Sequence, residues 1–351
     1  MPIDVLIVGQ GLAGSLLAWE CINQGYNVLV VDSGEINASQ VAAGLINPVT
    51  GQRLVKQSGV DYLLPTALTC YAQLSAKFNQ LLFKPLPMLR ILKTPLEQQS
   101  AQKRLNQRDY HGFLSIGKDV STSLVAHHGI LQQTQTGYLN TSALLGLMRK
   151  FLIENASYQQ SVLNYAEITL QPRLSWQSIC PKHIVFCEGH HGMQNPWFGN
   201  LPFQPAKGEI LHCQTTDLLQ QHIFNFGQWL IPTGDNQFKL GASFESGKTD
   251  TDTTQRAKQT LLQALSAVVP GLKPIEVLNQ QAGVRPTTLD KQALIGSHPQ
   301  FGNLHMFNGF GAKGSLLIPW YARQFVKYLF QQTPLPAQVN IQRYYETHYI
   351  S

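Results

Sequence analysis

Three glycines and one aspartate near the start of the chain have the residue types and the spacing of a nucleotide-binding site. Gly9, Gly11 and Gly14 form a G-x-G-x-x-G pattern, and Asp32 follows 18 positions after the last glycine. The first glycine of such a pattern permits a tight turn, the second lets backbone amides approach a pyrophosphate, and the third lets a helix pack closely on a strand. A carboxylate at the position of Asp32 binds ribose hydroxyls and disfavours a 2′-phosphate. The pattern therefore predicts a site for a dinucleotide other than NADP.

The elements that must position these residues can be read from the neighbouring sequence. The aliphatic run Val5 to Val8 predicts a buried strand, and Leu16, Leu17 and Cys21 mark the apolar face of a helix. A second strand, Val28 to Val31, ends on Asp32. A glycine-rich turn between strand and helix points the helix N-terminus at the phosphates. The motif alone does not distinguish NAD from FAD.

Two further segments are rich in small residues. The first contains Ser39, Ala42, Ala43 and Gly44, and small side chains of this kind suit a backbone pressed against a second, flat part of a ligand. The second is GFGAKGS, residues 309–315, which lies close to the C-terminus and precedes an apolar helix.

Composition narrows the class of protein. The net charge of +6 is spread over 351 residues without any run of five like charges, which argues against a dedicated nucleic-acid surface. Five cysteines form no C-x-x-C pair, as expected for a protein of the reducing cytoplasm without a zinc site. The N-terminus lacks a basic leader, and no apolar run reaches the roughly 18 residues of a membrane span.

The order of the predicted elements indicates the architecture. A βαβ start is followed by a helix from Tyr62 to Phe78, a helix capped by Asn140 or Thr141, and strands near 161–162, 167–170 and 183–187. The segments 206–214, 226–234 and 237–245 alternate like antiparallel strands, with a hairpin at Gly234 to Asn236, and a helix is expected from Thr253 to Val269. The predicted fold is α/β: a discontinuous Rossmann-like nucleotide domain with an inserted α+β substrate domain on a mostly antiparallel sheet. The expected boundaries are 1–84, 138–204 and 284–351 for the nucleotide domain, and 85–137 and 205–283 for the substrate domain.

With these residues in view, the chain resembles the FAD-dependent oxidoreductases of the D-amino-acid oxidase, glycine oxidase and sarcosine oxidase family. The resemblance runs nearly end to end and rests on these stretches: the Gly9/Gly11/Gly14/Asp32 fingerprint, Ala42-Ala43-Gly44, KGEIL (207–211), WLIPTGDNQFKLGASFE (229–245), AGVRPTTLDKQALIG (282–296) and NGFGAKGSLLIPWYARQFVKYL (308–329).

The resemblance implies bound FAD and a second domain that covers the flavin ring. The residues implied in cofactor binding are Gly9, Gly11, Leu12, Ala13, Gly14, Asp32, Ser33, Ser39, Ala42, Ala43, Gly44, Gly189, Gly309, Gly311, Ala312, Lys313, Gly314 and Ser315. Relatives that attach flavin covalently use a cysteine in the last of these regions, and this chain has none there. The FAD is therefore expected to be non-covalent.

Three residues are predicted to act in catalysis. Arg285, in GVRP, matches the position where amino-acid-oxidising relatives place an arginine on the substrate carboxylate; the alternative is a structural arginine that bonds backbone carbonyls. Lys313 and the start of the following helix would place positive charge near the flavin's N1 and C2 oxygen; the alternative is an exposed loop lysine. Trp229 is predicted to contact the substrate, with Tyr62 and Phe310 as further candidates for the pocket wall; the alternative is that these aromatics belong to the core.

Three functions agree with this resemblance. The first is oxidation of a small amine or amino acid by hydride transfer to flavin N5, which gives an imine that hydrolyses to an oxo product. The second is oxidation of a 2-hydroxy acid or a polyol phosphate, and the third is action on an amine carried by RNA or another macromolecule. Oxygen or another electron acceptor would complete the cycle; the sequence fixes neither that acceptor, nor the stereochemistry, nor the oligomeric state.

A few polar residues have no assigned role. Arg53 and Lys56 follow Gly51 in NPVTGQRLVK and are interpreted as part of a solvated loop. The pairs His190-His191 and His127-His128 resemble metal ligands, but neighbours on a strand point to opposite faces, and no third ligand is suitably spaced. No metal is therefore predicted.

Overall fold

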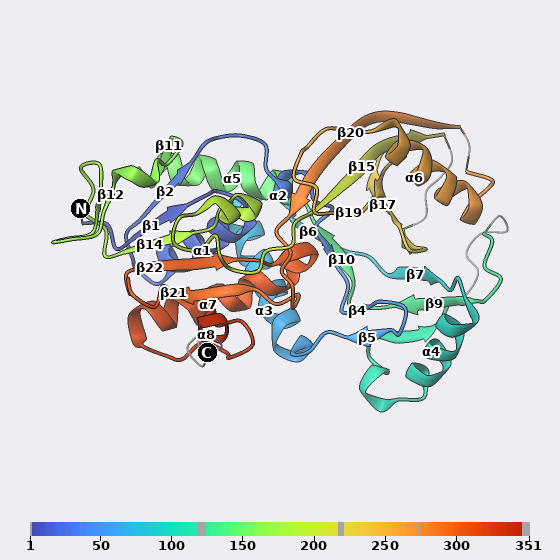
Figure 1. Cartoon of the computed structure of the whole chain (residues 1–351). Helices are drawn as coiled ribbons and strands as arrows, with labels where there is room; N and C mark the ends of the chain where they lie inside the picture. Colours follow the sequence, from blue (N-terminus) through green and yellow to red (C-terminus); the bar gives the residue numbers. More distant parts are fainter. Residues whose placement is uncertain (1, 118–123, 217–220, 273, 346–351) are drawn as a thin grey trace.

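The computed structural model describes residues 2–117, 124–216, 221–272 and 274–345. It contains two large sheets, joined by helix α3 (Val60–Phe78) and by extended connections (Figure 1). Each sheet is built from segments that are distant in the sequence.

The first sheet has six strands in the order β11-β2-β1-β14-β22-β21. All its pairs are parallel except β21–β22, which is antiparallel. Parallel strands buried on both faces read as continuous apolar runs, which explains VLIV and VLVV in the sequence. The strands are β1 (Val5–Val8), β2 (Val28–Asp32), β11 (Tyr158–Gln160), β14 (His183–Phe186), β21 (Leu294–Ser297) and β22 (Leu304–Asn308).

The two faces of this sheet have different covers. Val5 and Ile7 pack against helices, whereas Leu6 and Val8 pack against the irregular segment that contains Trp176 and Phe198. Figure 1 shows helices α1 and α7 lying against the sheet. The helices that pack on the face of Val5 and Ile7 are α1 (Leu12–Asn23), α3, α5 (Thr141–Glu154) and α7 (Gly314–Gln331).

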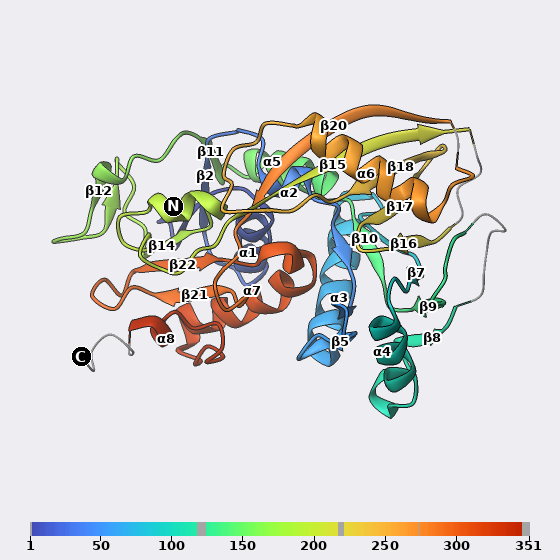
Figure 2. The ribbon, with the colours of Figure 1, turned by 45° about the vertical axis from the view of Figure 1, so that its right-hand side comes forward.

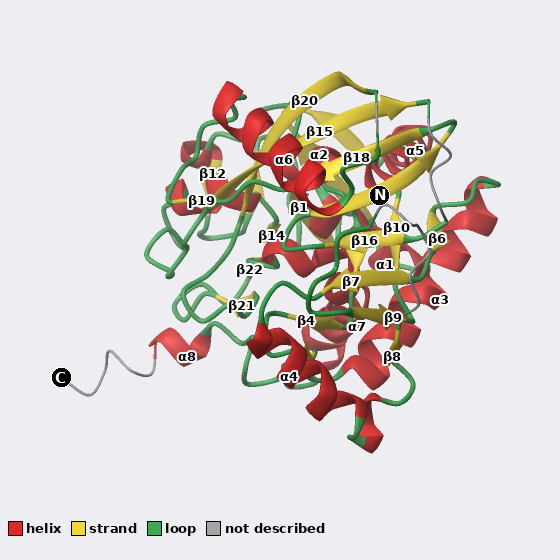
Figure 3. Cartoon of the chain, turned by 90° about the vertical axis from the view of Figure 1, so that its right-hand side faces the viewer, coloured by secondary structure: helices red, strands yellow, loops and turns green. Residues whose placement is uncertain are grey.

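The second sheet has nine strands, in the order β19-β15-β18-β17-β16-β7-β9-β8 with β20 also paired to β15. It is antiparallel except for the pair β7–β16. Figures 2 and 3 show its long strands β15 and β20 beside helix α6. The strands are β7 (Met88–Ile91), β8 (Leu114–Ile116), β9 (Ile130–Gln133), β15 (Ala206–Thr215), β16 (Ile223–Asn225), β17 (Trp229–Gly234), β18 (Gln237–Gly241), β19 (Glu245–Ser246) and β20 (Ile275–Arg285).

One face of the second sheet is covered by α6 (Gln255–Val268), whose Leu261 and Leu265 pack with Leu89 and Leu211. Side chains alternate along a strand, so Met88, the neighbour of Leu89, lies on the opposite face. That second face, called the inner face below, carries an apolar cluster of Ala43, Leu45, Leu86, Met88, Tyr138, Ile223, Trp229 and Ile231. The cluster includes Ala43 of the first small-residue segment, so the inner face contacts the part of the chain that is predicted to bind the nucleotide.

The remaining elements are short. They are α2 (Ala38–Val41), α4 (Pro95–Leu105), α8 (Gln342–Tyr345), β3 (Leu45–Ile46), β4 (Val49–Thr50), β5 (Val55–Lys56), β6 (Phe83–Pro85), β10 (Gly137–Leu139), β12 (Ile168–Thr169) and β13 (Ser175–Trp176), with 3-10 turns at Arg108–Tyr110, Tyr165–Glu167, Gly189–Gln194 and Gly311–Lys313. No helix of the described residues is long and apolar enough to span a bilayer.

Most of the predicted elements are present, and two are not where the sequence analysis placed them. The strand expected at 161–162 lies at Tyr158–Gln160. Its position follows from its pairing with β2, because Gln160 is opposite Asp32, the last residue of β2. The strand expected at 167–170 is a two-residue pair, β12 with β13, outside both large sheets. The domain boundaries remain a prediction, and the ranges 85–137 and 205–283 include residues outside the described part of the chain.

Candidate nucleotide and substrate site

The first glycine loop connects β1 to α1 and accepts no larger side chain at two positions. Gly9 has φ +100°, and a Cβ there would stand 2.7 Å from the carbonyl oxygen of Cys187. A Cβ on Gly14 would lie only 1.9 Å from the Gly9 carbonyl oxygen. The glycines therefore let the helix start directly against the strand edge, as the sequence pattern requires.

The N-terminus of α1 offers backbone N–H groups to an anion. Its N-cap, Gly11, offers no side-chain bond, and the Leu12 N–H donates to Ser39 Oγ at 3.0 Å. The N–H groups of Ala13 and Gly14 lie in the first turn, where helix geometry provides no acceptor. A free helix N-terminus of this kind binds phosphate groups. The Ser39 hydroxyl therefore holds the backbone of the glycine loop in place at Leu12.

Asp32 lies at the C-terminal end of β2 and is held in place from several directions. Its Oδ2 accepts the Gln10 N–H at 2.7 Å, and its Oδ1 accepts the Gly34 N–H at 2.9 Å. Arg149, on α5, places Nη2 3.2 Å from Oδ1. Ser33 next to it accepts a bond from the Glu35 N–H, so its hydroxyl serves the local turn. A glycine cradle, a free helix start and an oriented carboxylate together fit a dinucleotide.

Arg149 was missed by the sequence analysis. Its Nε also donates to Gln10 Oε1 at 2.8 Å, so one guanidinium joins the glycine loop to the acid. The residue lies on α5, for which the sequence predicts only a helix capped by Asn140 or Thr141. The signal is a charged residue next to Leu145 and Met148 on the packed side of the helix.

Gly44, in the first small-residue segment, is required by a close contact with the neighbouring strand β10. Its φ is +67°, and a Cβ would lie 1.9 Å from the Leu139 carbonyl oxygen of β10. The close approach is therefore between two backbones. Ala43 joins the apolar cluster of the inner face, and the Ala42 carbonyl accepts a bond from the Thr141 hydroxyl at 3.1 Å.

The C-terminal glycine loop lies beside the first one. Since β1, β14 and β22 are neighbouring parallel strands, the loops that follow them, with Gly9, Gly189 and Gly309, share one edge of the sheet. The Asn308 side chain donates to the Gly189 carbonyl at 2.8 Å and accepts the Gly309 N–H. A Cβ on Gly314 would stand 3.7 Å from Leu12 Cδ2.

Within this loop the backbone turns twice before α7 begins. Gly309 and Gly311 have φ +79° and +54°, and the 3-10 turn Gly311–Lys313 passes directly into α7 at Gly314. Ala312 is exposed, whereas Ser315 is buried and its carbonyl accepts the Tyr71 hydroxyl at 2.6 Å.

Lys313 reaches away from its own loop. Its Nζ donates to Gln57 Oε1 at 2.6 Å. Although the side chain as a whole is exposed, partial burial of the ammonium and the nearby Lys291 lower the pKa of Lys313. Lys313 therefore places a positive charge at the N-cap of α7, where the helix dipole is also positive.

Arg285 lies at the end of β20 on the inner face. Its Nη1 and Nη2 approach the carbonyl oxygens of Lys207 and Ser243, each at 3.4 Å. The guanidinium covers Gly208, where a Cβ would lie 2.1 Å from Nη2. Among the described residues no carboxylate pairs with it, and burial lowers the pKa of Arg285. The two carbonyl bonds are long, so the fork retains capacity for an anion.

Trp229 is the only one of the three candidate aromatics on the inner face. It packs over Gly241, where a Cβ would stand 2.8 Å from its ring, and it joins the apolar cluster. Phe310 is buried in the helix-packed core, and Tyr62 stacks against Trp320 at 4.6 Å between ring centroids. Neither of these two rings belongs to the inner-face cluster of Trp229, and their part in a pocket wall stays a prediction.

The unassigned polar residues fall in two places. Lys56 donates to the Asp109 carbonyl at 3.1 Å, and the Arg53 carbonyl accepts a bond from Arg104, so both lie near α4.

His190 and His191 are in the 3-10 turn Gly189–Gln194 and their ring centroids lie 4.0 Å apart, which corrects the assumption of a strand. Burial and His191 lower the pKa of His190 to about 4. The described residues contain no group of three or more His, Cys, Asp or Glu side chains that could hold a metal ion.

Comparisons with known proteins agree with this geometry. Residues 4–328 match the family model described as FAD dependent oxidoreductase (DAO). The chain is 20% identical to glycine oxidase of Pseudomonas aeruginosa, over 95% of this chain and 97% of that protein. It is 24% identical to the tRNA 5-methylaminomethyl-2-thiouridine biosynthesis bifunctional protein MnmC of Idiomarina loihiensis, over 90% of this chain but only 54% of that protein. The chain thus spans about half the length of this relative.

Solved structures show the same fold. Glycine oxidase from Geobacillus kaustophilus superposes with a TM-score of 0.83 at 18% identity and covers 97% of this chain and 98% of its own. L-proline dehydrogenase from P. horikoshii gives a TM-score of 0.81 at 16% identity, covering 99% of this chain and 98% of its own. The predicted combination of a Rossmann-like sheet and an inserted, mostly antiparallel sheet is confirmed. The chain belongs to the DAO family of FAD-dependent oxidoreductases and is an enzyme whose cofactor is FAD.

Proposed function

We propose that the protein oxidises a small amine or amino acid at the carbon that bears the nitrogen, giving an imine that water hydrolyses to an oxo product. FAD, when bound, supplies the acceptor for the hydride at its N5 atom. The observation that carries the proposal is Arg285, a half-buried guanidinium without a carboxylate partner among the described residues, on the sheet face that also carries Trp229.

Each group of residues would have a separate part in this reaction. Arg285 would bind the substrate carboxylate bidentately and fix the orientation of the reacting carbon. Trp229 and the apolar cluster around Met88 would exclude water from the reacting atoms. Lys313 and the start of α7 would stabilise negative charge that arrives on the cofactor.

The cofactor would be held without a covalent bond. Gly9, Gly11 and Gly14, with the amides of Ala13 and Gly14, would hold the pyrophosphate, and Asp32 the adenosine ribose. None of the five cysteines lies in residues 309–315. The similarity to glycine oxidase over nearly the whole of both chains supports a small amino-acid substrate.

A second candidate is an amine carried on tRNA. The observation in its favour is the similarity to a protein whose name refers to a methylaminomethyl group of tRNA. Salt-sensitive retention of tRNA by the purified protein would support it, and absence of retention at low salt would remove it.

The deciding experiment is an anaerobic screen for flavin reduction. Purified holoenzyme would be mixed with D- and L-amino acids, glycine, N-methylglycine, 2-hydroxy acids and polyol phosphates, and the flavin absorbance followed. Reduction by carboxylated amines is the expected result. Reduction by hydroxy acids or polyol phosphates alone would replace the proposal with alcohol oxidation.

A further inference from the structure

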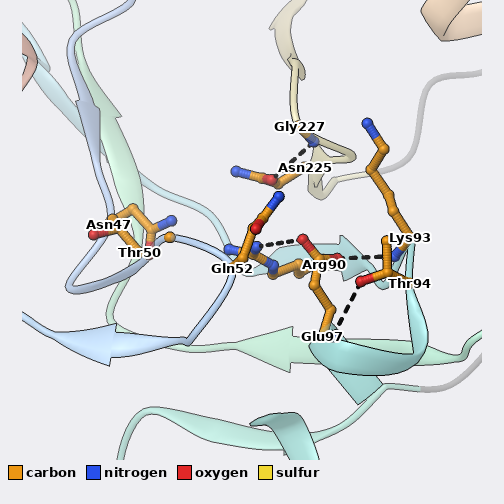
Figure 4. Close-up of a pocket in the computed structure, with 10 residues that line it drawn as sticks. Asn47, Thr50, Gln52, Arg90, Lys93, Thr94, Glu97, Asn225 and Gly227 are labelled. Atoms are coloured by element: carbon orange, nitrogen blue, oxygen red, sulfur yellow. Dashed lines mark hydrogen bonds and ion pairs between the residues drawn. The ribbon is translucent and has the colours of Figure 1, made fainter. Parts of the chain in front are cut away.

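A polar cavity of about 480 Å³ lies on the inner face, outside the residues assigned above. It is formed by β7, the start of α4, the turn between β16 and β17, and the loop that contains Asn47 and Gln52 (Figure 4). Arg90, Lys93, Glu97 and Asn225 line it. The function proposed above uses none of these side chains.

Strand register places this cavity next to the candidate substrate region. Trp229 is directly opposite Asn225, and Asn225 is directly opposite Arg90, on the neighbouring strands β17, β16 and β7. All three therefore belong to one row across the inner face. Because neighbouring strands lie about 4.8 Å apart, the backbones at Trp229 and Arg90 are separated by about 10 Å. The Asn47 amide lies 3.4 Å from Met88 Sδ, which brings the cavity up to the apolar cluster.

Arg90 is buried, and Glu97 is its one side-chain partner among the described residues. Only 7% of the residue is exposed, and its Nη2 contacts Glu97 Oε1 at 3.3 Å. Its Nε is fully buried and has no hydrogen-bond partner among the described residues. A guanidinium has five N–H donors, so most of its capacity is unfilled, and an unpaired buried donor is costly.

The charges around the cavity favour an anion. Arg90 and Lys93 contribute two positive charges and Glu97 one negative, which leaves one net positive charge. The Glu97 carboxylate is already engaged, because its Oε2 accepts the Lys93 N–H at 2.8 Å. The Lys93 ammonium lies beside Gly227, where a Cβ would stand 2.9 Å from Nζ. In Figure 4 the side chains of Arg90, Gln52 and Asn225 face the same space.

We propose that this cavity is a second anion subsite, which binds the distal carboxylate or phosphate of the amine that the enzyme oxidises. The inference rests on the amine oxidation proposed above. It predicts a substrate longer than glycine, whose reacting carbon lies near Trp229 and whose acidic end lies against Arg90 and Lys93. The amide N–H groups of Gln52 and Asn225 would complete the hydrogen bonding of that acidic group.

A kinetic test compares matched substrates. N-alkylglycines with chains of graded length that end in a carboxylate, a phosphonate or a neutral amide would be assayed with the holoenzyme. Lys93 is exposed, so Lys93→Met tests the subsite without disturbing the core. Lys103, exposed near the other end of α4, provides the matched control Lys103→Met.

The expected result is a change in preference. The ratio of kcat/KM for acid-tailed over amide-tailed substrates should fall about tenfold in Lys93→Met and stay unchanged in Lys103→Met. Arg90→Lys should lower the same ratio further, because a lysine has no planar fork. The carboxylate and phosphonate arms identify which acid the site prefers. Equal ratios in Lys93→Met and the parent enzyme would overturn the proposal and leave Arg90 and Glu97 as a structural ion pair.

A binding test separates this inference from the proposed function. Glutarate and inorganic phosphate would be titrated calorimetrically into the parent enzyme and both lysine variants. A dissociation constant raised about tenfold or more in Lys93→Met alone would support the anion site even if no amine reduced the flavin, in which case only the amine oxidation would fail. Identical binding of both probes in all three proteins would refute the anion site, whatever amines the enzyme oxidised.

Discussion

Lys313 and Gln57, 256 positions apart in the chain, are joined by a hydrogen bond of 2.6 Å from the lysine Nζ to the amide Oε1. This bond ties the C-terminal glycine loop to the loop that follows β5. The partner is a neutral amide, so this bond does not neutralise the positive charge of the lysine.

We expect Lys313→Met to lower the reduction potential of the bound flavin and to destabilise its anionic reduced form, because a cation near the cofactor is lost. A loss of about 1.4 kcal/mol corresponds to about 30 mV for a two-electron couple. Photoreduction with a reference dye would measure the potential. Gln57→Leu, which removes the hydrogen bond but keeps the charge, serves as the control. A potential unchanged in Lys313→Met would show that the loop only shapes the pocket.

Gly14→Ala should abolish FAD retention, because its Cβ would lie 1.9 Å from the Gly9 carbonyl oxygen and push the helix start away from the strand. We expect the dissociation constant for FAD to rise at least about 100-fold. The ratio of flavin to protein absorbance after gel filtration measures this. Gly146→Ala, at an open position on α5, is the matched control and should raise the unfolding free energy by about 0.5–1 kcal/mol. Full retention of flavin by Gly14→Ala would contradict the assigned role of the loop.

Arg285→Lys should lower kcat/KM for carboxylated amines by about 100-fold, since a point charge cannot replace the bidentate fork. Amines without a carboxylate should respond much less. Steady-state assays with pairs such as an amino acid and its decarboxylated amine would measure the difference. The same loss on both members of each pair would instead assign Arg285 a structural role through the carbonyls of Lys207 and Ser243.

Acidification should destabilise the protein through His305. This ring is fully buried against His183, with 2.9 Å between Nδ1 of His183 and Nε2 of His305, and both burial and His183 lower the pKa of His305 well below 6.5. The unfolded state binds a proton near pH 6.5 that the folded state refuses, so stability present above that pH is lost as the pH falls. The steepest contribution is about 1.4 kcal/mol per pH unit.

Urea unfolding at pH 7.5, 6.5 and 5.5 would measure this slope in the parent enzyme and in His305→Asn. We expect the variant to be less stable at neutral pH but to lose less stability on acidification. An identical slope in the two proteins would contradict the linkage to His305.

Local patterns in the sequence predicted the nucleotide loop well. The turn at Gly9, the close packing at Gly14 and the acid at Asp32 are all fixed by neighbours within one βαβ unit. Long strands and capped helices were likewise found by their periodicity. The length of short elements such as β12 was predicted wrongly, because two residues are too few to show a periodicity.

Contacts that depend on pairing between distant strands could not be predicted. Arg90 becomes a neighbour of Asn225 and Trp229 only through the parallel pairing of β7 with β16. One local signal was present: Arg90 follows Leu89 and precedes Ile91, so it is a charged residue on the other face of an apolar strand. Gly44 shows the reverse case, since its small size serves the backbone of Leu139.

The nucleotide sheet also has a consequence for biosynthesis. β14 lies at its centre, between β1, made first, and β22, which ends at Asn308. At about 5–20 residues per second, a ribosome needs roughly 15–60 s between the first of these strands and the last. Throughout that interval the nascent chain presents an unpaired apolar strand edge. Folding of the nucleotide sheet therefore cannot be complete until β22 has been made, and the glycine loop that follows β22 is available to the cofactor only after that.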